Sequence, residues 1–426
     1  MMKRFVLAVF ILGAIMLASG CEDSQVFNTS VTAPSPFAEP LIAGRNKIVV
    51  ISDIHMGEER AADAAYCWFT ENAKLLECFL DEVAQSEQVK TLVIAGDFFD
   101  EWIVPMETAP FQSGITSSEG YFLSVANAPL NINIVNKLKA IVNAGTIEVV
   151  YVPGNHDMLM TEAIMQKIIP GITWAGTSTG MGDYWPSSHI VMEHGHRYDF
   201  FNSPDSLTQA GSLLPPGYFV SRVFASKSAA NGPVVEEDLV AIADLEFVAA
   251  WDIAIAEINI HGLDKDAKII KMGIDGYTAD MSVNDAKDNY KANIGSQWDQ
   301  RQSINGVYSK MTETSAILAG SGIGWWGDLE DPADLQYLVP GRAKIVVFGH
   351  SHKAMLKKNL VTLEKIYANT GTWIDAKYVK SGYATRSFVV ISPSISRGSE
   401  TDTVTLYQYN GTGEVSKLAE ESVKVN

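Results

Sequence analysis

The sequence from Val150 to Asp157, Val-Tyr-Val-Pro-Gly-Asn-His-Asp, points most directly to the architecture of the chain. The apolar run from Ile147 to Val152 predicts a strand that is buried on both faces, and Pro153-Gly154 ends it abruptly. An amide, an imidazole and a carboxylate therefore follow the carboxyl end of a strand. Because open α/β sheets hold ligands at that edge, the stretch predicts an α/β fold with a site here.

Four more polar blocks follow predicted strands in the same way. Three of these strands are Ile48–Ile51, Leu92–Ala95 and Ile345–Phe348, and the fourth is expected at Ser188–Glu193. The blocks after them are Ser52-Asp53-Ile54-His55, Gly96-Asp97-Phe98-Phe99-Asp100, Gly349-His350-Ser351-His352 and Glu193-His194-Gly195-His196-Arg197-Tyr198-Asp199. Strands of one sheet bring their carboxyl ends to a common edge, so we expect the blocks to converge on one site.

Composition sets the size of the core and excludes one class of partner. The chain has 426 residues, of which 47% are hydrophobic, and this predicts one large domain with insertions. The formal net charge is -18, and no Lys/Arg cluster interrupts the acidic composition. A protein that binds the nucleic-acid backbone normally has a basic stripe, so we expect no nucleic-acid partner. A small phosphate ester held by a local positive charge remains compatible.

The first twenty residues are expected to be a signal peptide. Lys3-Arg4 precede an apolar run, Phe5 to Leu17, that is too short to span a membrane, and small residues then lead to Cys21. The pattern resembles a bacterial lipoprotein signal, which would make Cys21 the lipidated first residue of the mature protein. Ordinary secretion and an uncleaved anchor are the alternatives. We expect an exported protein, anchored on the periplasmic or cell-surface side, with residues 21–43 as a flexible tether.

The helices predicted in the first half of the chain follow from apolar spacing. Residues 61–84 are expected to form one helix, 131–144 a second that Gly145 ends, and 161–169 a third. Cys67 and Cys78 would lie about 16 Å apart along the first helix, too far for a disulfide unless that helix breaks near Thr70. Two apolar segments near the C-terminus, 387–391 and 404–409, predict a hairpin.

A large insertion is predicted between the last two polar blocks. Residues 200–342 have mainly helical character, clearest in 236–260, where apolar residues keep helical spacing up to His261. The insertion also contains the pair Trp325-Trp326, which suits a packed lid and alternatively stacking on a base or contact with lipid. We expect a helical cap over the site, with packing at the side or a dimer surface as the alternative. The core would then comprise residues 44–199 and 343–426.

The residue types in the polar blocks are those of a metal site. Six of the eight histidines lie in the blocks, beside aspartates and an asparagine, and the blocks contain no cysteine. Imidazole and oxygen ligands suit borderline divalent metals such as Mn, Fe, Zn or Ni. Alternate residues of an extended segment point to the same side, so Asp53-x-His55 and His350-x-His352 are each predicted to chelate a metal.

The five blocks, in this order, resemble the calcineurin-like metallophosphoesterase superfamily. The shared pattern is Asp-x-His, Gly-Asp-x-x-Asp, Gly-Asn-His-Asp, a single His and Gly-His-x-His. The resemblance implies a four-layer αββα sandwich of two mixed β-sheets flanked by helices. It also implies two divalent metal ions that share Asp97. One ion would be held by Asp53, His55, Asp97 and His352, and the other by Asp97, Asn155, His194 and His350.

The resemblance further implies hydrolysis of a phosphate mono- or diester by a hydroxide that bridges the two ions. His156 would protonate the leaving oxygen, and Asp100 would orient that histidine. We prefer His194 to His196 as the ligand because Gly195 follows it, as in the family. Asp157 is expected to brace its turn. Arg197 and Asp199 are expected to form a solvated surface pair, with contact to substrate as the alternative.

Three alternatives stay open from the sequence. A surface binding protein would keep the metal fold and use the cap to hold a partner without turnover, which the presence of His156 and Asp100 argues against. A nuclease of the superfamily conflicts with the net charge of -18. Residues 96–102 also resemble the branch that hydrolyses a UDP-linked diacylglucosamine, but that branch has Arg in place of His156 and is cytosolic.

Overall fold

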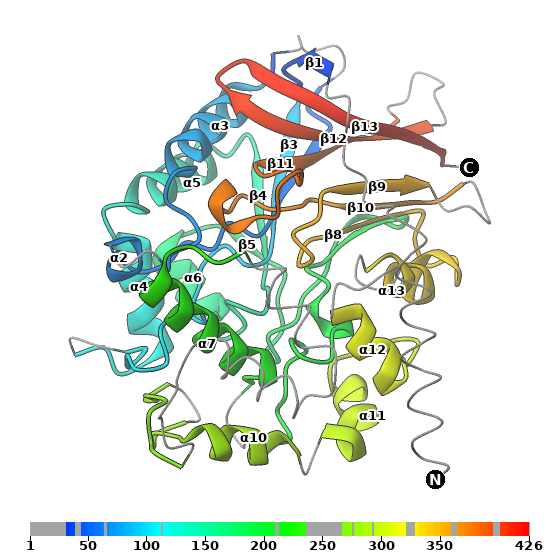
Figure 1. Ribbon diagram of the computed structural model, residues 1–426. Coiled ribbons are helices and arrows are strands. Elements are labelled where there is room, and N and C mark those ends of the chain that lie inside the picture. Colours follow the sequence, from blue (N-terminus) through cyan, green and yellow to red (C-terminus); the bar gives the residue numbers. More distant parts are fainter. Residues whose placement is uncertain are drawn as a thin grey trace. The chain divides into compact units, whose positions relative to one another are not determined.

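The computed structural model (Figure 1) describes residues 31–38, 44–63, 66–111, 114–208, 213–235, 266–274, 277–291, 294–320, 329–358, 364–394 and 401–425. The predicted signal peptide with Cys21, the predicted helix 236–260, His261 and the pair Trp325-Trp326 lie outside these residues. No helix in the described ranges is long and apolar enough to cross a membrane.

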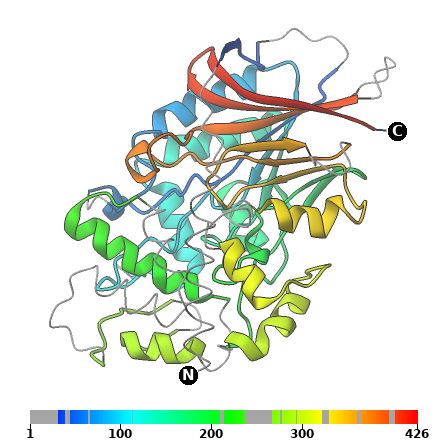
Figure 2. The same cartoon turned by 45° about the vertical axis from the view of Figure 1, so that its right-hand side comes forward.

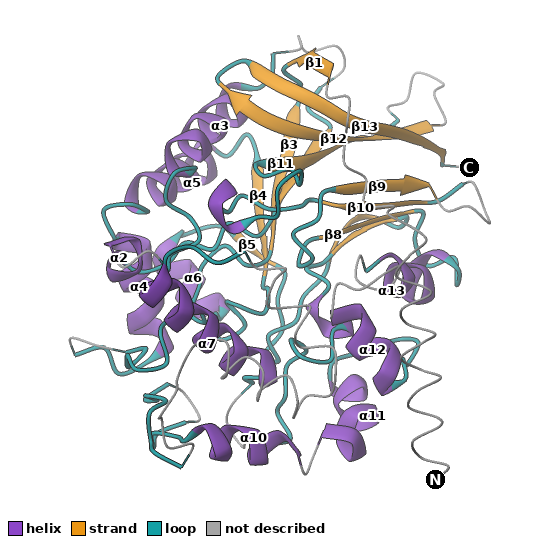
Figure 3. Ribbon diagram, in the orientation of Figure 1, coloured by secondary structure: helices purple, strands orange, loops and turns teal. Residues whose placement is uncertain are grey.

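Two mixed β-sheets form the centre of the fold (Figure 3). The larger sheet has the order β1 (Val31–Pro34), β13 (Glu414–Lys424), β12 (Thr401–Gly411), β11 (Ser387–Ser392), β2 (Lys47–Ile51), β3 (Val89–Ala95), β4 (Glu148–Val152), β5 (Thr173–Trp174). The smaller sheet has the order β6 (Tyr184–Ser187), β7 (Ile190–Met192), β8 (Ile345–Phe348), β10 (Ile366–Asn369), β9 (Met355–Lys358). The predicted hairpin is present as β11 and β12, and β13 extends it.

Parallel pairing brings the predicted strand ends together. In the larger sheet β2, β3, β4 and β5 are parallel, with Val50 opposite Val93 and Val93 opposite Val150. In the smaller sheet β8 is parallel to both β7 and β10. All five polar blocks therefore follow the carboxyl ends of parallel strands.

The two sheets and the helices outside them form four layers. Alternate residues of a strand are buried on opposite faces of its sheet, one face against helices and the other toward the second sheet. Val49 and Ile51 belong to the core under α3 (Ala73–Gln85) and α5 (Ile132–Ala144), which cover the outer face of the larger sheet in Figure 1. Ile48 and Val50 are equally buried on the opposite face, where β12 and β13 contact β9 of the smaller sheet. The outer face of the smaller sheet is covered by α13 (Glu330–Ala333) and the π-helical turn η3 (Asp334–Leu338). The predicted four-layer fold is confirmed.

The predicted helix over residues 61–84 is wrong because the chain forms two helices with a turn between them. These are α2 (Glu59–Asp63) and α3, and the buried carboxylate of Asp375 accepts hydrogen bonds from the backbone N–H groups of Thr70, Glu71 and Asn72 ahead of α3. Cys67 and Cys78 are nevertheless both free, and the Cys67 thiol donates to the carbonyl of Phe69 at 3.2 Å.

Two other helices begin at a side-chain cap, and the first of them is the helix predicted for residues 161–169. The hydroxyl of Thr161 caps α6 (Glu162–Ile168) by accepting from the N–H of Ile164. Between β3 and α5, Ser117 caps α4 (Ser118–Asn127) in the same way. Gly145 ends α5 with a left-handed backbone, as predicted.

Part of the predicted tether belongs to the folded unit. Val31–Pro34 form β1, which pairs antiparallel with β13, and the compact unit of the chain begins at Val31. Phe37 is buried against Phe79 and Phe388, with ring centroids 5.3 and 5.7 Å away. The expectation of a flexible tether is therefore wrong for residues 31–38, because these residues add a strand and a core side chain.

The described part of the insertion is mainly helical and lies away from the β12–β13 hairpin in both Figure 1 and Figure 2. Its helices are α7 (Pro216–Asn231), α10 (Val283–Lys291), α11 (Ile294–Ile304), α12 (Glu313–Gly320) and α13. The buried guanidinium of Arg222 in α7 donates to the carbonyls of Val104, Thr108 and Lys271 at 2.6, 2.7 and 2.9 Å. The bonds to Val104 and Thr108 join the insertion to the loop that follows Gly96–Asp100, and the bond to Lys271 lies within the insertion.

Candidate metal centre

Three of the polar blocks leave their strands through a left-handed backbone at non-glycine residues. Asp53, His55, Asp97, His350 and His352 have φ angles between 51° and 69°. Residues other than glycine adopt this conformation rarely and at a cost, and such residues concentrate at functional sites. The sequence prediction of extended Asp-x-His and His-x-His pairs is therefore wrong. The side chains are instead aimed by a sharp turn at each strand end.

Glycines beside three of the site residues permit close packing between blocks. A Cβ added to Gly154 would lie 2.5 Å from the backbone nitrogen of Asp97, and one added to Gly96 would overlap the ring of His194. A Cβ at Gly349 would lie 2.6 Å from the carboxylate of Asp53. Each glycine thus contacts a site residue from a different strand, which is the physical reason for its place in the motif.

A first group of ligand atoms comes from Asp53, His55 and His352, all within 4.8 Å of one another. The Nε2 atoms of His55 and His352 are 3.0 Å apart, and Nε2 of His352 is 3.2 Å from Oδ1 of Asp53. Nδ1 of His55 is bonded to Asp100 at 2.9 Å, so its Nε2 faces the group as a lone pair when the ring is neutral. All three residues are buried.

A second group comes from Asp97, His194 and His350, again within 4.8 Å. Nε2 of His194 lies 3.1 Å from Oδ2 of Asp97 and 3.0 Å from Oδ1 of Asn155. The same Asp97 oxygen is 3.7 Å from Nε2 of His55, so Asp97 stands between the two groups. His350 and His352 fall in different groups, and the prediction that the two chelate a single metal is wrong.

The donor set of the second group fits a cation. Nδ1 of His194 is bonded to the carbonyl of Ala95 at 2.9 Å, which leaves Nε2 of the neutral ring as an acceptor. This nitrogen faces an amide oxygen and a carboxylate, which also only accept. A positive charge must therefore lie among these atoms, whether as a proton or as a metal ion. The mixture of imidazole nitrogen, carboxylate and amide oxygen suits a borderline divalent metal.

The charges of the buried residues also favour a bound cation. Burial by itself would lower the pKa of His194, but the carboxylates of Asp97 and Asp53 outweigh burial and raise it to about 9. Burial likewise opposes ionisation of Asp97, yet His194 and His156 hold the pKa of that carboxyl well below its usual range. The buried aspartates thus remain negative and attract positive charge.

His156 and Asp100 form the expected pair at the edge of the groups. Nδ1 of His156 is 3.1 Å from Oδ1 of Asp100, and its backbone N–H donates to Asp97 at 2.9 Å. Asp100 also binds His55, so one carboxylate holds both a predicted ligand and the predicted acid. Ligand atoms of His156, His55 and Asp97 form a third group within 4.8 Å. The bond of Nδ1 to Asp100 leaves Nε2 of His156 as the nitrogen available for chemistry.

The structure separates the remaining candidates. Asp157 braces its turn, as predicted, by accepting from the N–H groups of Gly154 and Phe98 at 2.6 and 3.0 Å. His196 turns away from Asn155, and its Nε2 is bonded to the carbonyl of Gly180 at 3.1 Å. His194 is therefore the histidine of this block that faces the predicted ligands.

The prediction that Arg197 and Asp199 form a solvated pair is wrong, since both are buried. Nε of Arg197 is 2.7 Å from the carboxylate of Glu193, and Oδ2 of Asp199 is 3.0 Å from Nε2 of His350. Sequence reasoning thus missed Asp199 as a site residue. The signal for it was its place in the polar block Glu193–Asp199.

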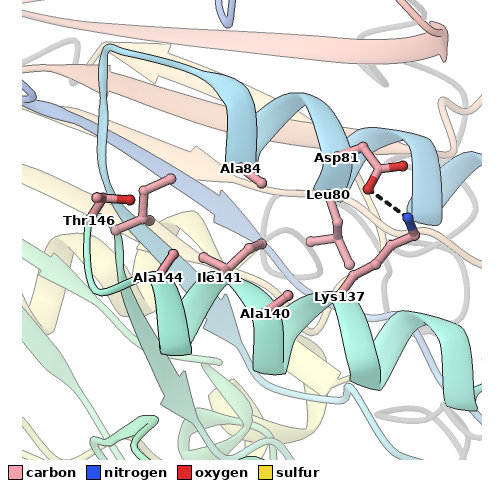
Figure 4. A pocket seen from close by; sticks show the side chains of 9 residues that line it. Leu80, Asp81, Ala84, Lys137, Ala140, Ile141, Ala144 and Thr146 are labelled. Carbon is pink, nitrogen blue, oxygen red and sulfur yellow. Dashed lines mark hydrogen bonds and ion pairs between the residues drawn. The ribbon is translucent and has the colours of Figure 1, made fainter.

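A groove on the outer helical layer contains none of these residues. It lies between α3 and α5, and its side chains include the ion pair of Lys137 and Asp81 at 2.6 Å (Figure 4). The other residues that line it are mostly small or apolar: Leu80, Ala84, Ala140, Ile141, Ala144, Thr146 and Ile147. It lacks the ligand atoms found at the strand ends, so the candidate site is at the strand ends.

The fold and the donor groups define a metal-binding α/β protein with its site at the carboxyl ends of strands. A family model described as calcineurin-like phosphoesterase matches residues 46–233 of this chain. The match includes Asp53, Asp97, Asn155 and His194, whereas His350 and His352 join the site through β8. This confirms the resemblance drawn from the motifs.

The comparisons with individual proteins add no functional information. Vps29 of Chaetomium thermophilum aligns with 11% identity over 90% of this chain and 100% of that chain, with a TM-score of 0.29. A comparison with curated proteins gave no match.

Proposed function

We propose that this protein is a metal-dependent phosphoesterase that hydrolyses a phosphate mono- or diester at a dinuclear centre. The observation that carries the proposal is the position of Asp97 between two groups of buried ligand atoms. Its Oδ2 atom is 3.1 Å from Nε2 of His194 and 3.7 Å from Nε2 of His55. We assign Asp53, His55, Asp97 and His352 to one ion. Asp97, Asn155, His194 and His350 are assigned to the other.

Two divalent ions in such a site would orient the phosphoryl oxygens and supply a hydroxide nucleophile near neutral pH. The protein's own contribution is to place a proton donor beside the leaving group. His156, held by Asp100 through Nδ1, presents Nε2 to the site and would protonate the leaving oxygen. Asp100 fixes both the orientation and the tautomer of that ring.

The surroundings of the site favour a small anionic substrate. The formal net charge of -18 repels polyanions, while two divalent ions would make the site locally positive. A nucleic acid is therefore not the proposed substrate. A binding protein without turnover is the second candidate, and the buried His156–Asp100 pair argues against it because binding alone requires no proton donor.

Hydrolysis of p-nitrophenyl phosphate and of bis-p-nitrophenyl phosphate tests the proposal. The protein is assayed after chelation and again after addition of Mn²⁺ or Zn²⁺. Turnover that returns with metal supports the proposal, and the ratio of the two rates indicates the ester type. Metal binding without turnover of either ester, or of a panel of natural phosphate esters, would favour the binding protein.

A His156→Ala variant tests the assigned proton donor. We expect kcat to fall about 10²- to 10⁴-fold, while the variant binds as much metal as the wild type. Unchanged activity would remove His156 from the mechanism. Loss of bound metal would instead show that His156 acts as a ligand.

We further propose that the protein is exported and anchored to a bacterial membrane by a lipid on Cys21. The support is the sequence pattern of residues 1–21, a basic start, a short apolar run and small residues before the cysteine. A Cys21→Ser variant should lose incorporation of labelled fatty acid and leave the membrane fraction. Retention of the label in this variant would contradict the assignment.

A further inference from the structure

We propose that Asp199 and Asn202 are positioning residues that hold two ligands of the second metal ion, His350 and Asn155. The inference rests on the proposed function and extends it to residues outside the predicted ligand set. It also gives the predicted insertion a role at the site, because Asn202 lies at its start.

Asp199 fixes the imidazole of His350. Oδ2 of Asp199 is 3.0 Å from Nε2 of His350, and Asp199 is 1% exposed. A carboxylate only accepts hydrogen bonds, so Nε2 of His350 carries the proton and Nδ1 keeps the lone pair. A histidine that binds a metal through one nitrogen commonly donates its other N–H to a carboxylate, which fixes the ring and makes it a stronger ligand.

Asn202 extends this contact to the second ligand. Its side-chain amide donates to the same Oδ2 of Asp199, and its Oδ1 accepts from Nδ2 of Asn155 at 3.5 Å. With Nδ2 of Asn155 directed to Asn202, Oδ1 of Asn155 lies 3.0 Å from Nε2 of His194. Asn202 therefore favours the orientation of Asn155 in which the oxygen faces the proposed ion.

The turn that carries both residues is held by hydrogen bonds on two sides. The backbone N–H groups of Phe201 and Ser203 donate to the side chain and to the carbonyl of Asp199, each at 2.8 Å. From α11, Arg301 donates to the carbonyl of Ser203 at 2.8 Å, and Asn305 donates to the hydroxyl of Ser203 at 2.7 Å. Two buried side chains of the insertion thus hold this turn against the site.

The pair acts on one group of ligands. Among the described residues, the proposed ligands that the side chains of Asp199 and Asn202 contact are His350 and Asn155, both assigned to the second ion. His55, a ligand of the first ion, is held instead by Asp100. Loss of the pair should therefore weaken the second ion selectively.

Manganese titration of the full-length protein tests this selectivity. Apo protein is prepared by chelation, and Mn²⁺ binding is followed by calorimetry and by electron paramagnetic resonance. The wild type should bind two ions and develop the signal of a spin-coupled pair. In Asp199→Asn and in Asn202→Ala, the first ion should bind as in the wild type and the second about 10- to 100-fold more weakly. The coupled signal should then appear only at higher Mn²⁺.

A matched control and a folding check accompany the titration. Asp280→Asn removes another carboxylate of the insertion, one that pairs with Lys271 at 2.8 Å on the surface, and it should leave both ions unchanged. The thermal midpoint of each apo variant shows whether it is folded, and if Asp199→Asn does not fold, Asn202→Ala decides.

Unchanged affinity for the second ion in both variants would overturn the inference, as would equal weakening of both ions. A wild-type protein that binds no metal would overturn the proposed function itself, and the inference with it. Because the wild type and the variants are titrated side by side, the two failures are distinguishable.

Discussion

The indole of Trp102 stacks on the imidazole of His156, with ring centroids 4.7 Å apart and planes inclined by 28°. Trp102 is fully buried, and its backbone N–H donates to Asp100 at 2.8 Å. Asp100 in turn binds Nδ1 of His156. The imidazole of His156, the proposed proton donor, is therefore held at its edge by the carboxylate of Asp100 and on its face by the indole of Trp102. Both of these residues lie in the segment after β3.

This contact predicts that Trp102 affects turnover without touching a metal. Trp102→Leu should lower kcat by about 10- to 100-fold, because a small displacement of a catalytic group is costly, whereas Trp102→Phe keeps an aromatic face and should retain most of the activity. Steady-state kinetics with metal in excess measures both variants. Equal activity of the leucine and phenylalanine variants would show that the stack has no role in turnover.

The close approach of Gly154 to Asp97 predicts that one methyl group can disrupt the site. In Gly154→Ala the new Cβ would overlap the carboxylate and backbone of Asp97. We expect loss of metal binding or of folding, measured by bound metal per chain and by the thermal midpoint. Gly120→Ala is the matched control, since its Cβ would meet the nearest atom at 3.4 Å within helix α4. The control should bind metal normally and should not lower the thermal midpoint. Normal metal binding by Gly154→Ala would refute the packing argument.

The buried carboxylates predict that metal removal destabilises the fold. An ion present at about 100 times its Kd adds about 2.7 kcal/mol to the free energy of unfolding, because it binds only the native site. Chelation should then lower the thermal midpoint by roughly 2–5 °C, and added Mn²⁺ should restore it. An Asp97→Asn variant, which lacks the shared ligand, should respond much less. Identical midpoints of the wild type with and without chelator would count against a resident metal.

Most of the site was predictable from the sequence because its signals are local. Each predicted ligand lies within a few residues of the end of an apolar run. The run predicts a β-strand, and the end of the run predicts where along the chain the ligand leaves that strand. The strand Ile345–Phe348 was predicted with the bounds that the structure shows. The left-handed backbone of Asp53 and His55 was not predictable, because Asp and His adopt it more often than most residues but still rarely, and the surrounding packing decides where.

What the sequence did not indicate depends on contacts between distant residues. Asp199 seemed a surface residue because its partner His350 is 151 positions away. Val31–Pro34 seemed a tether because the surrounding segment is rich in Ser, Thr and Pro, and their strand exists only through pairing with β13 near the other end of the chain. The break before α3 depends on Asp375, which is about 300 residues further along the chain.

Burial of Cys67 predicts that its thiol is unreactive in the native protein. Burial is the main cause that raises the pKa of this thiol to about 12, so at pH 8 only about one molecule in 10⁴ carries the thiolate. Iodoacetamide at pH 8 should therefore leave Cys67 unmodified in native protein and modify it after denaturation, as mass spectrometry of peptides can show. Cys78, which is partly exposed, serves as the internal comparison. Rapid native labelling of Cys67 would contradict its burial.

From the contacts of Arg222 we predict that the insertion stabilises the loop of residues 104–108, which follows β3 and the polar block Gly96–Asp100. Its guanidinium is fully buried and donates to the carbonyls of Val104, Pro105, Met106, Thr108 and Lys271. Arg222→Met fills a similar volume but leaves these buried acceptors without their donor, at a cost of about 1–3 kcal/mol or more. The thermal midpoint should fall, and hydrogen exchange should rise first in residues 104–108.

Lys74→Met is the control for this change, because it removes an exposed cation that is 2.7 Å from Glu77 on the surface of α3, and it should leave the midpoint unchanged. If Arg222→Met lowers the midpoint but exchange in residues 104–108 stays as slow as in the wild type, Arg222 stabilises helix α7 and not the loop. Because this loop follows the segment that holds His156, we expect Arg222→Met to reduce kcat as well, by less than Trp102→Leu does.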